Sequence, residues 1–280
     1  MELTPQGQQR YAALVRAGDE VVVGLDFDGV LAPIVDDPER AHIHPEAHAA
    51  LAELGGQVRA IAVITGRPAR QAVALGGLDE LADALATQGC QLLVFGQYGN
   101  ERWSGSDRRV VGPRPPSGLA GFEADLPRVL READAADAWV EDKGLAVAVH
   151  TRRLAEPEAA FERLLPRLTE LAQRHGLAVE PGRAVVEIRA PGSDKGGAVR
   201  TLVADLDAGG FLYAGDDLGD LPAFGALGEL AEDGLPTLRV ASGSEEENAL
   251  VEQADVVVDG PDGVLELLRG FTGDLAGRRV

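Results

Sequence analysis

The sequence predicts an α/β protein with a Rossmann-like core, a doubly wound parallel sheet, interrupted by an inserted α+β cap domain. Near both ends of the chain, short apolar segments alternate with helical ones, as in parallel sheets with crossover helices. Charged or turn-forming residues directly follow several of the apolar segments, as in open sheets that bind ligands at one edge. The middle of the chain has two helices, each followed by two strand-like segments, which favours an antiparallel sheet covered by two helices.

The first part of the core begins with a short apolar segment. Residues 21–25 (VVVGL) end in DFDG, and such a segment before turn residues is typical of a buried parallel strand. Further strands are expected at 59–64 and 92–95, with helices at 45–56 and 71–86 between the strands.

The composition changes at residues 104–118, which are rich in Gly, Pro, Ser and Arg. This composition predicts a hinge, and a second break follows at APGSDKGGA. The elements expected between the two breaks are a helix at 119–132, strands at 138–142 and 145–151, a helix at 157–174, and strands at 177–180 and 184–189.

The α/β pattern resumes after the second break. A helix is expected at 196–205, a strand at 211–214, a helix near 220–226, and strands around 237–240 and 256–258. We therefore expect a core made of residues 1–105 and 190–280, with residues 106–189 as the inserted cap domain.

Charge and cysteine content narrow the function classes. The formal net charge is −20, and a chain this acidic repels nucleic acid, so nucleic acid is not an expected partner. The single cysteine, Cys90, excludes an internal disulfide and fits a reducing cytoplasm. No apolar segment is long enough to cross a membrane and the N-terminus has no signal-peptide pattern, so we expect a cytoplasmic protein without a membrane partner.

Four segments carry candidate chemistry: Asp26–Gly29 (DFDG), Thr65–Arg67 (TGR), Lys195, and Gly215–Asp220 (GDDLGD). Three of them directly follow an expected strand, and Lys195 opens an expected helix. Because ligands of open parallel sheets bind at the carboxyl edge, we expect these segments to meet there.

The acidic residues predict a divalent cation. Asp26 and Asp28 are two residues apart in an extended segment and point to the same side. Neighbouring carboxylates repel unless a cation or a shared proton relieves them. With Asp216 and an acidic neighbour such as Asp217, the oxygen-rich set favours Mg²⁺, which also bridges to phosphate.

The same residues suit phosphoryl transfer. One aspartate can accept a phosphoryl group, while a second carboxyl protonates the leaving alkoxide and later activates water. Thr65 and Lys195 can bind phosphate oxygens. Taken singly, each segment also has a structural interpretation: DxDG as a turn or calcium loop, TGR as a turn with an exposed arginine, GDD as a helix N-cap, and Lys195 as a solvated side chain.

In this order, DFDGVL, ITGR, DKG and GDDLGD resemble the four motifs of the haloacid dehalogenase superfamily. The resemblance implies that Asp26 is the nucleophile and Asp28 the general acid/base, and that Thr65 and Lys195 bind the phosphoryl group; we also assign Arg67 to substrate binding. The implied Mg²⁺ ligands are Asp26, the backbone carbonyl of Asp28, and Asp216, with Asp217 or Asp220 in support. One departure is Val30, which stands where many members have threonine.

Longer segments resemble the trehalose-6-phosphate phosphatase family, namely residues 25–41, 96–103, 140–152 and 180–199. The resemblance implies Mg²⁺-dependent hydrolysis of a small sugar phosphate, trehalose 6-phosphate, and a functional link to a trehalose-6-phosphate synthase. The cap residues that it assigns to the sugar are Glu141, Lys143, Arg152, Arg183 and Glu187.

The chemistry of these cap residues agrees with that assignment, because carboxylates and cations are common partners of sugar hydroxyls. Glu141 and Lys143 would share one face of a strand, and Arg183 and Glu187 another. A solvated strand face with cross-strand ion pairs is the alternative. His150 is left outside the catalytic set.

Other functions stay open at this point. The chain could act on another sugar phosphate, such as sucrose phosphate or a glycosyl phosphoglycerate, or be a phosphohexomutase. A catalytically silent sugar-phosphate sensor would have lost Asp26, Asp28 or Lys195, and all three are present. A calcium-binding module is disfavoured because the acidic residues are spread over distant segments instead of one loop.

Overall fold

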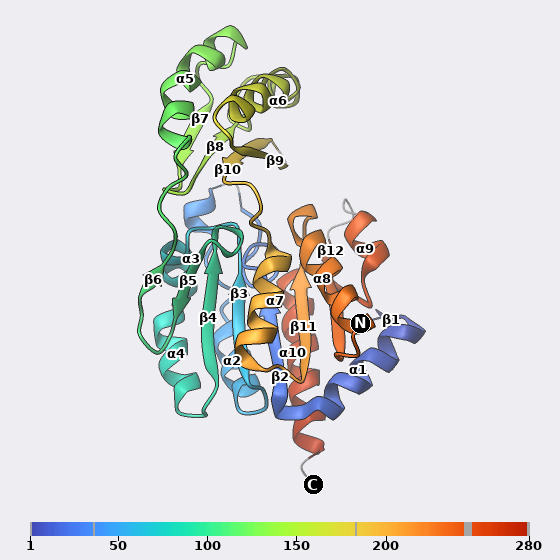
Figure 1. Cartoon of the computed structure of the whole chain (residues 1–280). Helices are drawn as coiled ribbons and strands as arrows, with labels where there is room; N and C mark the ends of the chain where they lie inside the picture. Colours follow the sequence, from blue (N-terminus) through green and yellow to red (C-terminus); the bar gives the residue numbers. More distant parts are fainter. Residues whose placement is uncertain (1, 36, 183, 244–247, 279–280) are drawn as a thin grey trace. The chain divides into compact units, whose positions relative to one another are not determined.

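The computed structural model describes residues 2–35, 37–182, 184–243 and 248–278. It divides into two compact units: the core, Met1–Gly112 with Asp194–Val280, and the cap, Pro113–Ser193 (Figure 1). The predicted domain limits, 105/106 and 189/190, fall a few residues before the divisions in the structure. The first limit differs because strands β5 (Glu101–Ser104) and β6 (Val110–Val111) form a hairpin on the edge of the core sheet.

The core sheet has the order β1-β13-β12-β11-β2-β3-β4-β5-β6 among the described residues. Its six central strands, from β13 to β4, are parallel, and the outer strands β1, β5 and β6 are antiparallel to their neighbours. The remaining bounds are β1 (Glu2–Leu3), β2 (Val21–Leu25), β3 (Ala60–Ile64), β4 (Gln91–Gly96), β11 (Gly210–Gly215), β12 (Thr237–Gly243) and β13 (Val256–Asp259).

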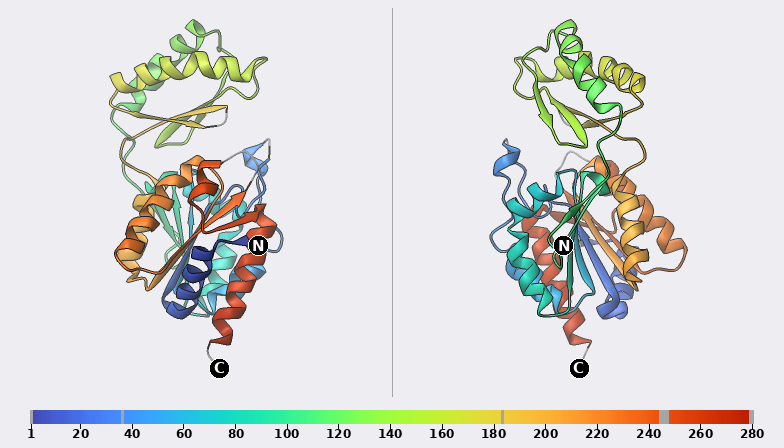
Figure 2. Two further views of the ribbon diagram at one scale, coloured as in Figure 1. Left: turned by 90° about the vertical axis from the view of Figure 1, so that its right-hand side faces the viewer. Right: turned by 60° about the vertical axis from the view of Figure 1, so that its left-hand side comes forward.

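Helices cover both faces of this sheet (Figure 2). Side chains alternate along each strand, so Val21, Val23 and Leu25 of β2 face one hydrophobic core while Val22 faces the other. The first core is covered by α1 (Pro5–Ala17), α2 (Ala47–Gly55), α3 (Ala69–Gly76), α4 (Leu78–Ala86) and α10 (Gly260–Gly277), and the second by α7 (Lys195–Leu206), α8 (Leu221–Glu232) and α9 (Asn248–Gln253). The predicted doubly wound core is confirmed.

One predicted helix is wrong. Residues 71–86 form not one helix but two, α3 and α4, which are separated by Gly77 in the left-handed conformation (φ +56°). This conformation suits glycine and ends a right-handed helix. The prediction also left out α1 and α10.

The cap is a four-stranded antiparallel sheet in the order β7-β8-β10-β9. Two helices, α5 (Leu119–Glu132) and α6 (Pro157–Arg174), pack on one face of the sheet and form a separate hydrophobic core with it. This matches the predicted α+β cap. The strands are β7 (Trp139–Asp142), β8 (Ala146–His150), β9 (Ala178–Gly182) and β10 (Val185–Arg189).

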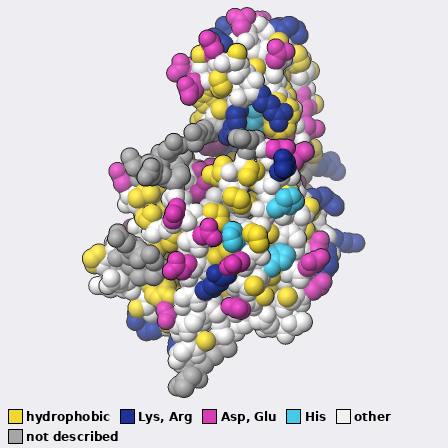
Figure 3. Space-filling model, turned by 180° about the vertical axis from the view of Figure 1, so that it is seen from behind, with side chains coloured by type: hydrophobic (Ala, Val, Ile, Leu, Met, Phe, Trp, Pro, Cys, Tyr) yellow, Lys and Arg dark blue, Asp and Glu magenta, His cyan; other side chains and the backbone are white. Residues whose placement is uncertain are grey.

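Within the described ranges, no helix combines the length and the apolar character needed to cross a membrane. On the face drawn in Figure 3, acidic side chains are interspersed with basic and hydrophobic ones. The net charge of −20 is therefore not gathered into a single patch on that face.

Candidate active site

The carboxyl edge of the core sheet brings three of the four predicted segments to neighbouring strands. Asp26 directly follows β2, Thr65 follows β3 and Asp216 follows β11. The backbone N–H of Asp26 donates to the carbonyl of Ala214 at 2.9 Å, so Asp26 continues the pairing of β2 with β11. Asp26 is buried, with 5% of its surface exposed.

The DFDG segment is a tight turn that starts directly at Asp26. The N–H groups of Leu31 and Ala32 both donate to the carbonyl of Phe27, and the N–H of Gly29 donates to Ala32. Gly29 has φ +67°, and a Cβ at this position would clash with the carboxylate of Asp216. Glycine therefore serves both the turn and the close approach of an acidic side chain.

Val30, at the position where threonine is common in the superfamily, is fully buried in the hydrophobic core. Its side chain packs with apolar neighbours there and leaves the polar groups of the DFDG turn in place.

Lys195, the first residue of α7, is buried between two carboxylates. Its Nζ lies 2.7 Å from Oδ2 of Asp26 and 2.7 Å from Oδ1 of Asp220. The idea of a solvated lysine is therefore wrong, since only 2% of its surface is exposed. The two carboxylates raise the lysine pKa well above its ordinary value and outweigh the opposing effect of burial, so Lys195 keeps its positive charge.

Asp220 organises the end of the GDDLGD segment. It is fully buried, and its Oδ2 accepts from the backbone N–H groups of Asp216 at 2.9 Å and Asp217 at 3.2 Å. Its Oδ1 accepts from Lys195 and, at 2.6 Å, from the hydroxyl of Tyr213. Asp220 thus supports the site by fixing the backbone on which Asp216 and Asp217 stand.

Asp217 begins the 3-10 turn Leu218–Asp220, and its Oδ1 accepts from the N–H of Gly219 at 2.9 Å. The helix-cap interpretation of GDD therefore holds for this residue. It does not exclude a second contact, because a carboxylate has several lone pairs.

Carboxylate oxygens of Asp26, Asp216, Asp217 and Asp220 lie within 4.8 Å of one another. Burial, and then the nearby charge of Asp26, raises the pKa of Asp216 to about 10. Burial also raises the pKa of Asp26 well above its usual range, although Lys195 opposes this effect. Four carboxylates beside one lysine repel one another, which raises the electrostatic free energy of the site. A hard divalent cation such as Mg²⁺ would offset this repulsion.

Among the described residues, the side chain of Asp28 lies outside this acidic group. Instead, Arg67 of the TGR segment donates to both of its oxygens, each at 2.7 Å. Arg67 is 8% exposed, so the interpretation of TGR as a turn with an exposed arginine is wrong. Any metal contact of Asp28 is therefore expected from its backbone carbonyl.

Thr65 is buried at the end of β3, with 1% of its surface exposed. Its Oγ1 accepts from the N–H of Arg67 at 3.1 Å, which holds the TGR turn closed. A Cβ on Gly66 would fall 2.9 Å from the ring of Tyr98, so glycine lets the GQYGNE loop lie against the TGR turn.

The cap brings together only some of the residues assigned to the sugar. Lys143 and Glu187 form an ion pair at 2.5 Å, and Glu141 accepts at 2.9 Å from Nε2 of His150 in the tautomer that carries a proton there. Arg152 is an exposed residue of the turn after β8, and Arg183 lies outside the described residues. The alternative, a solvated strand face with cross-strand ion pairs, is therefore only half correct: Lys143 and Glu187 pair across the sheet, but only 14% and 7% of their side chains are exposed. A sugar contact stays a prediction.

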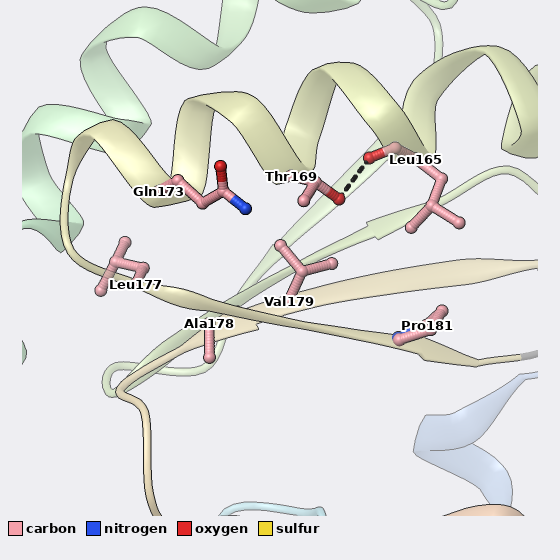
Figure 4. A pocket seen from close by; sticks show the side chains of 7 residues that line it. All are labelled: Leu165, Thr169, Gln173, Leu177, Ala178, Val179 and Pro181. Carbon is pink, nitrogen blue, oxygen red and sulfur yellow. Dashed lines mark hydrogen bonds between the residues drawn. The ribbon is translucent and has the colours of Figure 1, made fainter.

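The cap also has an apolar groove of about 410 Å³ between α6 and β9 (Figure 4). Within it, the hydroxyl of Thr169 donates back to the carbonyl of Leu165 at 2.7 Å. The described residues that line this groove are uncharged and offer no cation for a phosphate. Its lining residues are Leu165, Thr169, Gln173, Leu177, Ala178, Val179 and Pro181.

Sequence reasoning missed three contacts around the site. The hydrogen bond of Tyr213 to Asp220, the clamp of Arg67 on Asp28, and the pairing of His150 with Glu141 join residues from different elements. For Tyr213 there was one signal, a hydroxyl in an otherwise apolar strand directly before GDD.

Comparison with known proteins agrees with this geometry. A trehalose-phosphatase family model matches residues 130–256. A probable trehalose-phosphate phosphatase from Sinorhizobium fredii is 30% identical over 227 residues, which cover 80% of this chain and 80% of that protein. The chain belongs to the trehalose-phosphatase family.

Two further similarities concern a longer protein and a solved structure with the same fold. An uncharacterized glycosyl hydrolase from Mycobacterium tuberculosis is 35% identical over 236 residues; the match covers 80% of this chain but 17% of that much longer protein. The C-terminal domain of the Candida albicans trehalose-6-phosphate phosphatase has the same fold, with a TM-score of 0.77 and 20% identity over 98% of both chains.

Proposed function

We propose that the protein is a phosphatase that hydrolyses trehalose 6-phosphate to trehalose and phosphate, with Mg²⁺ and through a phosphoryl group carried by Asp26. The observation that carries the proposal is the position of Asp26. Its carboxylate lies at the carboxyl edge of the sheet, beside a charged lysine and within an acidic cluster. Phosphoryl transfer is catalysed mainly by positioning and by offsetting negative charge, and this arrangement provides both.

The two steps assign different tasks to Asp26 and Asp28. An oxygen of Asp26 attacks phosphorus, the bond from phosphorus to the sugar oxygen breaks, and Asp28 gives its proton to that oxygen. Water then attacks the phosphoryl group on Asp26 while Asp28 takes a proton from the water, and phosphate leaves. Each step returns the proton that the other used.

Other core residues hold the phosphoryl group and the acid/base residue. Lys195 offers a fixed positive charge for phosphoryl oxygens, and Thr65 offers a hydroxyl donor. Arg67 would bind substrate. Its two hydrogen bonds to Asp28 support a second role, which is to position the acid/base residue.

Mg²⁺ would be held by Asp26, the backbone carbonyl of Asp28, and Asp216, with Asp217 beside them. The closeness of these carboxylates supports this proposal. When bound, the cation offsets negative charge on the carboxylates and on the phosphoryl oxygens.

The sugar would be read by the cap through Glu141, Lys143, Arg152, Arg183 and Glu187. Glu141, Glu187 and Lys143 offer acceptors and donors that fit the hydroxyls of a polyol. We further propose that the enzyme acts in the cytoplasm and in connection with a trehalose-6-phosphate synthase. The buried thiol of Cys90, without a partner cysteine in the sequence, supports a reducing compartment.

Phosphate release from a panel of sugar phosphates tests the proposal. The panel holds trehalose 6-phosphate, sucrose 6-phosphate, glucose 6-phosphate and glucosyl phosphoglycerate, each with and without Mg²⁺. Release that needs Mg²⁺ and is largely confined to trehalose 6-phosphate is the expected result. Preference for another member would replace the substrate, and release from none would point to a sugar-phosphate sensor.

A further inference from the structure

The face of the cap sheet opposite its helices has an unusual order of charges. Directly paired residues of neighbouring strands lie on the same face. The register places Glu141, Ala148, Glu187 and Glu180 in one row across β7, β8, β10 and β9. Three of the four positions in this row are glutamates.

The two glutamates on β10 and β9, Glu187 and Glu180, stand directly opposite each other. Like charges in such a pair destabilise a sheet. Each is offset by a cation from a neighbouring position: Lys143 pairs with Glu187 at 2.5 Å, and Arg189 pairs with Glu180 at 2.8 Å. Both cations stand two residues further along the chain than a glutamate of the row, Lys143 after Glu141 and Arg189 after Glu187, so basic residues flank the acidic row.

Small residues on β8 leave room above the middle of the face. Ala148 lies between Glu141 and Glu187 in the row, and Ala146 lies beside Arg189. Because β8 presents only methyl groups here, the side chain of Lys143 can extend across it from the end of β7 to Glu187 on β10.

The carboxylate of the Glu180–Arg189 pair, on the edge strand β9, is more exposed than the carboxylate of the Lys143–Glu187 pair. The side chain of Glu180 is 45% exposed, while that of Arg189 is 9% exposed and also donates to the carbonyl of Ser193. Arg189 is therefore held in place, and it orients a carboxylate that is open to solvent.

We propose that Glu180, positioned by Arg189, is a further specificity-determining residue: it binds hydroxyls of the additional ring that a disaccharide phosphate has over a monosaccharide phosphate. The inference rests on the proposed function, in which the cap reads the sugar. Three strand spacings separate β7 from β9, about 14 Å in all. A row of this length extends beyond what one pyranose ring can contact.

The test compares Glu180→Ala and the isosteric Glu180→Gln with a matched control, Glu162→Ala, which removes an exposed glutamate from α6 of the same unit. KM and kcat are measured for trehalose 6-phosphate, glucose 6-phosphate and an aryl phosphate. Because a hydrogen bond to a charged group is lost, Glu180→Ala should raise KM for trehalose 6-phosphate about tenfold. Values for the other two substrates should not change, Glu180→Gln should show a smaller effect, and Glu162→Ala none.

The outcomes separate this inference from the proposed function. If the wild type cleaves trehalose 6-phosphate but Glu180→Ala affects all substrates alike or none, the Glu180–Arg189 pair is only structural and the inference is overturned. If the wild type prefers a different disaccharide phosphate and Glu180→Ala selectively weakens that substrate, the inference stands although the proposed substrate fails. A wild type that cleaves only monosaccharide phosphates overturns both.

Discussion

Arg67 donates to both carboxylate oxygens of Asp28, through Nε at 2.7 Å and a terminal nitrogen at 2.7 Å. The same guanidinium donates to the carbonyl of Pro38 at 2.8 Å and lies over the ring of Phe27, 5.4 Å from its centre. A planar guanidinium group that is fixed by several contacts holds the carboxylate of Asp28 in one orientation. Asp28, the proposed acid/base residue, is thus positioned by the segment that also carries Thr65.

Replacing this fork by a point charge should slow the reaction. Arg67→Lys keeps the positive charge but loses the paired hydrogen bonds, so Asp28 is no longer aligned for proton transfer. We expect kcat to fall about 10- to 100-fold, part of what a general acid/base contributes. The control is Arg70→Lys, at an exposed position in the next helix. Equal activity of both variants would contradict a positioning task for Arg67.

Lys195 should be as important for stability as for activity. Lys195→Met keeps the length of the side chain but leaves Asp26 and Asp220 buried without their common cation. Breaking a buried pair in this way costs about 3–5 kcal/mol of unfolding free energy. Denaturant titration of the metal-free protein measures this loss, and a variant as stable as the wild type would show that the two carboxylates are offset by other means.

Mg²⁺ should stabilise the protein, and more strongly at higher pH. The pKa of Asp216 is raised from 3.8 to about 10 in the metal-free protein. Between these values the folded state holds a proton that the unfolded chain has released, so this group lowers stability progressively as pH rises. Mg²⁺ takes the place of the proton, and its effect on Tm should grow from pH 6 to pH 8.

Asp216→Asn is the control for that experiment. The amide cannot ionise and is a poorer ligand for a hard cation, so the Mg²⁺-dependent rise in Tm should be largely lost at both pH values. A rise that is the same in the variant and in the wild type would place the cation elsewhere.

Glu187→Ala should separate sugar recognition from phosphoryl chemistry. Glu187 belongs to the cap and contacts Lys143. Its loss should lower kcat/KM for trehalose 6-phosphate about tenfold or more, because an acceptor for sugar hydroxyls is removed, and should change turnover of a small aryl phosphate little. Parallel losses on both substrates would argue against cap recognition.

The regular part of the fold and the acidic residues were predictable from the sequence. Apolar segments such as VVVGL and FLYA predict buried strands. Polar residues at their ends meet because the carboxyl ends of parallel strands lie at the same edge of the sheet. Asp26, Thr65, Asp216 and Lys195 lie at or beside that edge for this reason.

Long-range side-chain contacts were not predictable in the same way. The hydrogen bonds of Arg67 to Asp28 depend on how the TGR turn folds back. The hydrogen bond of Tyr213 to Asp220 depends on how deeply both side chains are buried. The break at Gly77 was missed because a single glycine within a helical pattern is often tolerated. Its left-handed conformation ends α3, with its N–H donating to the carbonyls of Val73 and Ala74.

The most direct test of Asp26 as the phosphoryl acceptor is to trap the phosphoryl group on the protein. The wild type is mixed with trehalose 6-phosphate and Mg²⁺, quenched within one turnover, and reduced with borohydride, which converts an aspartyl phosphate to homoserine. Mass spectrometry of the peptide that spans β2 and the DFDG turn then locates the change. We expect homoserine at position 26 and none in Asp26→Asn, which should also be inactive. Homoserine at position 28, or continued turnover by Asp26→Asn, would contradict it.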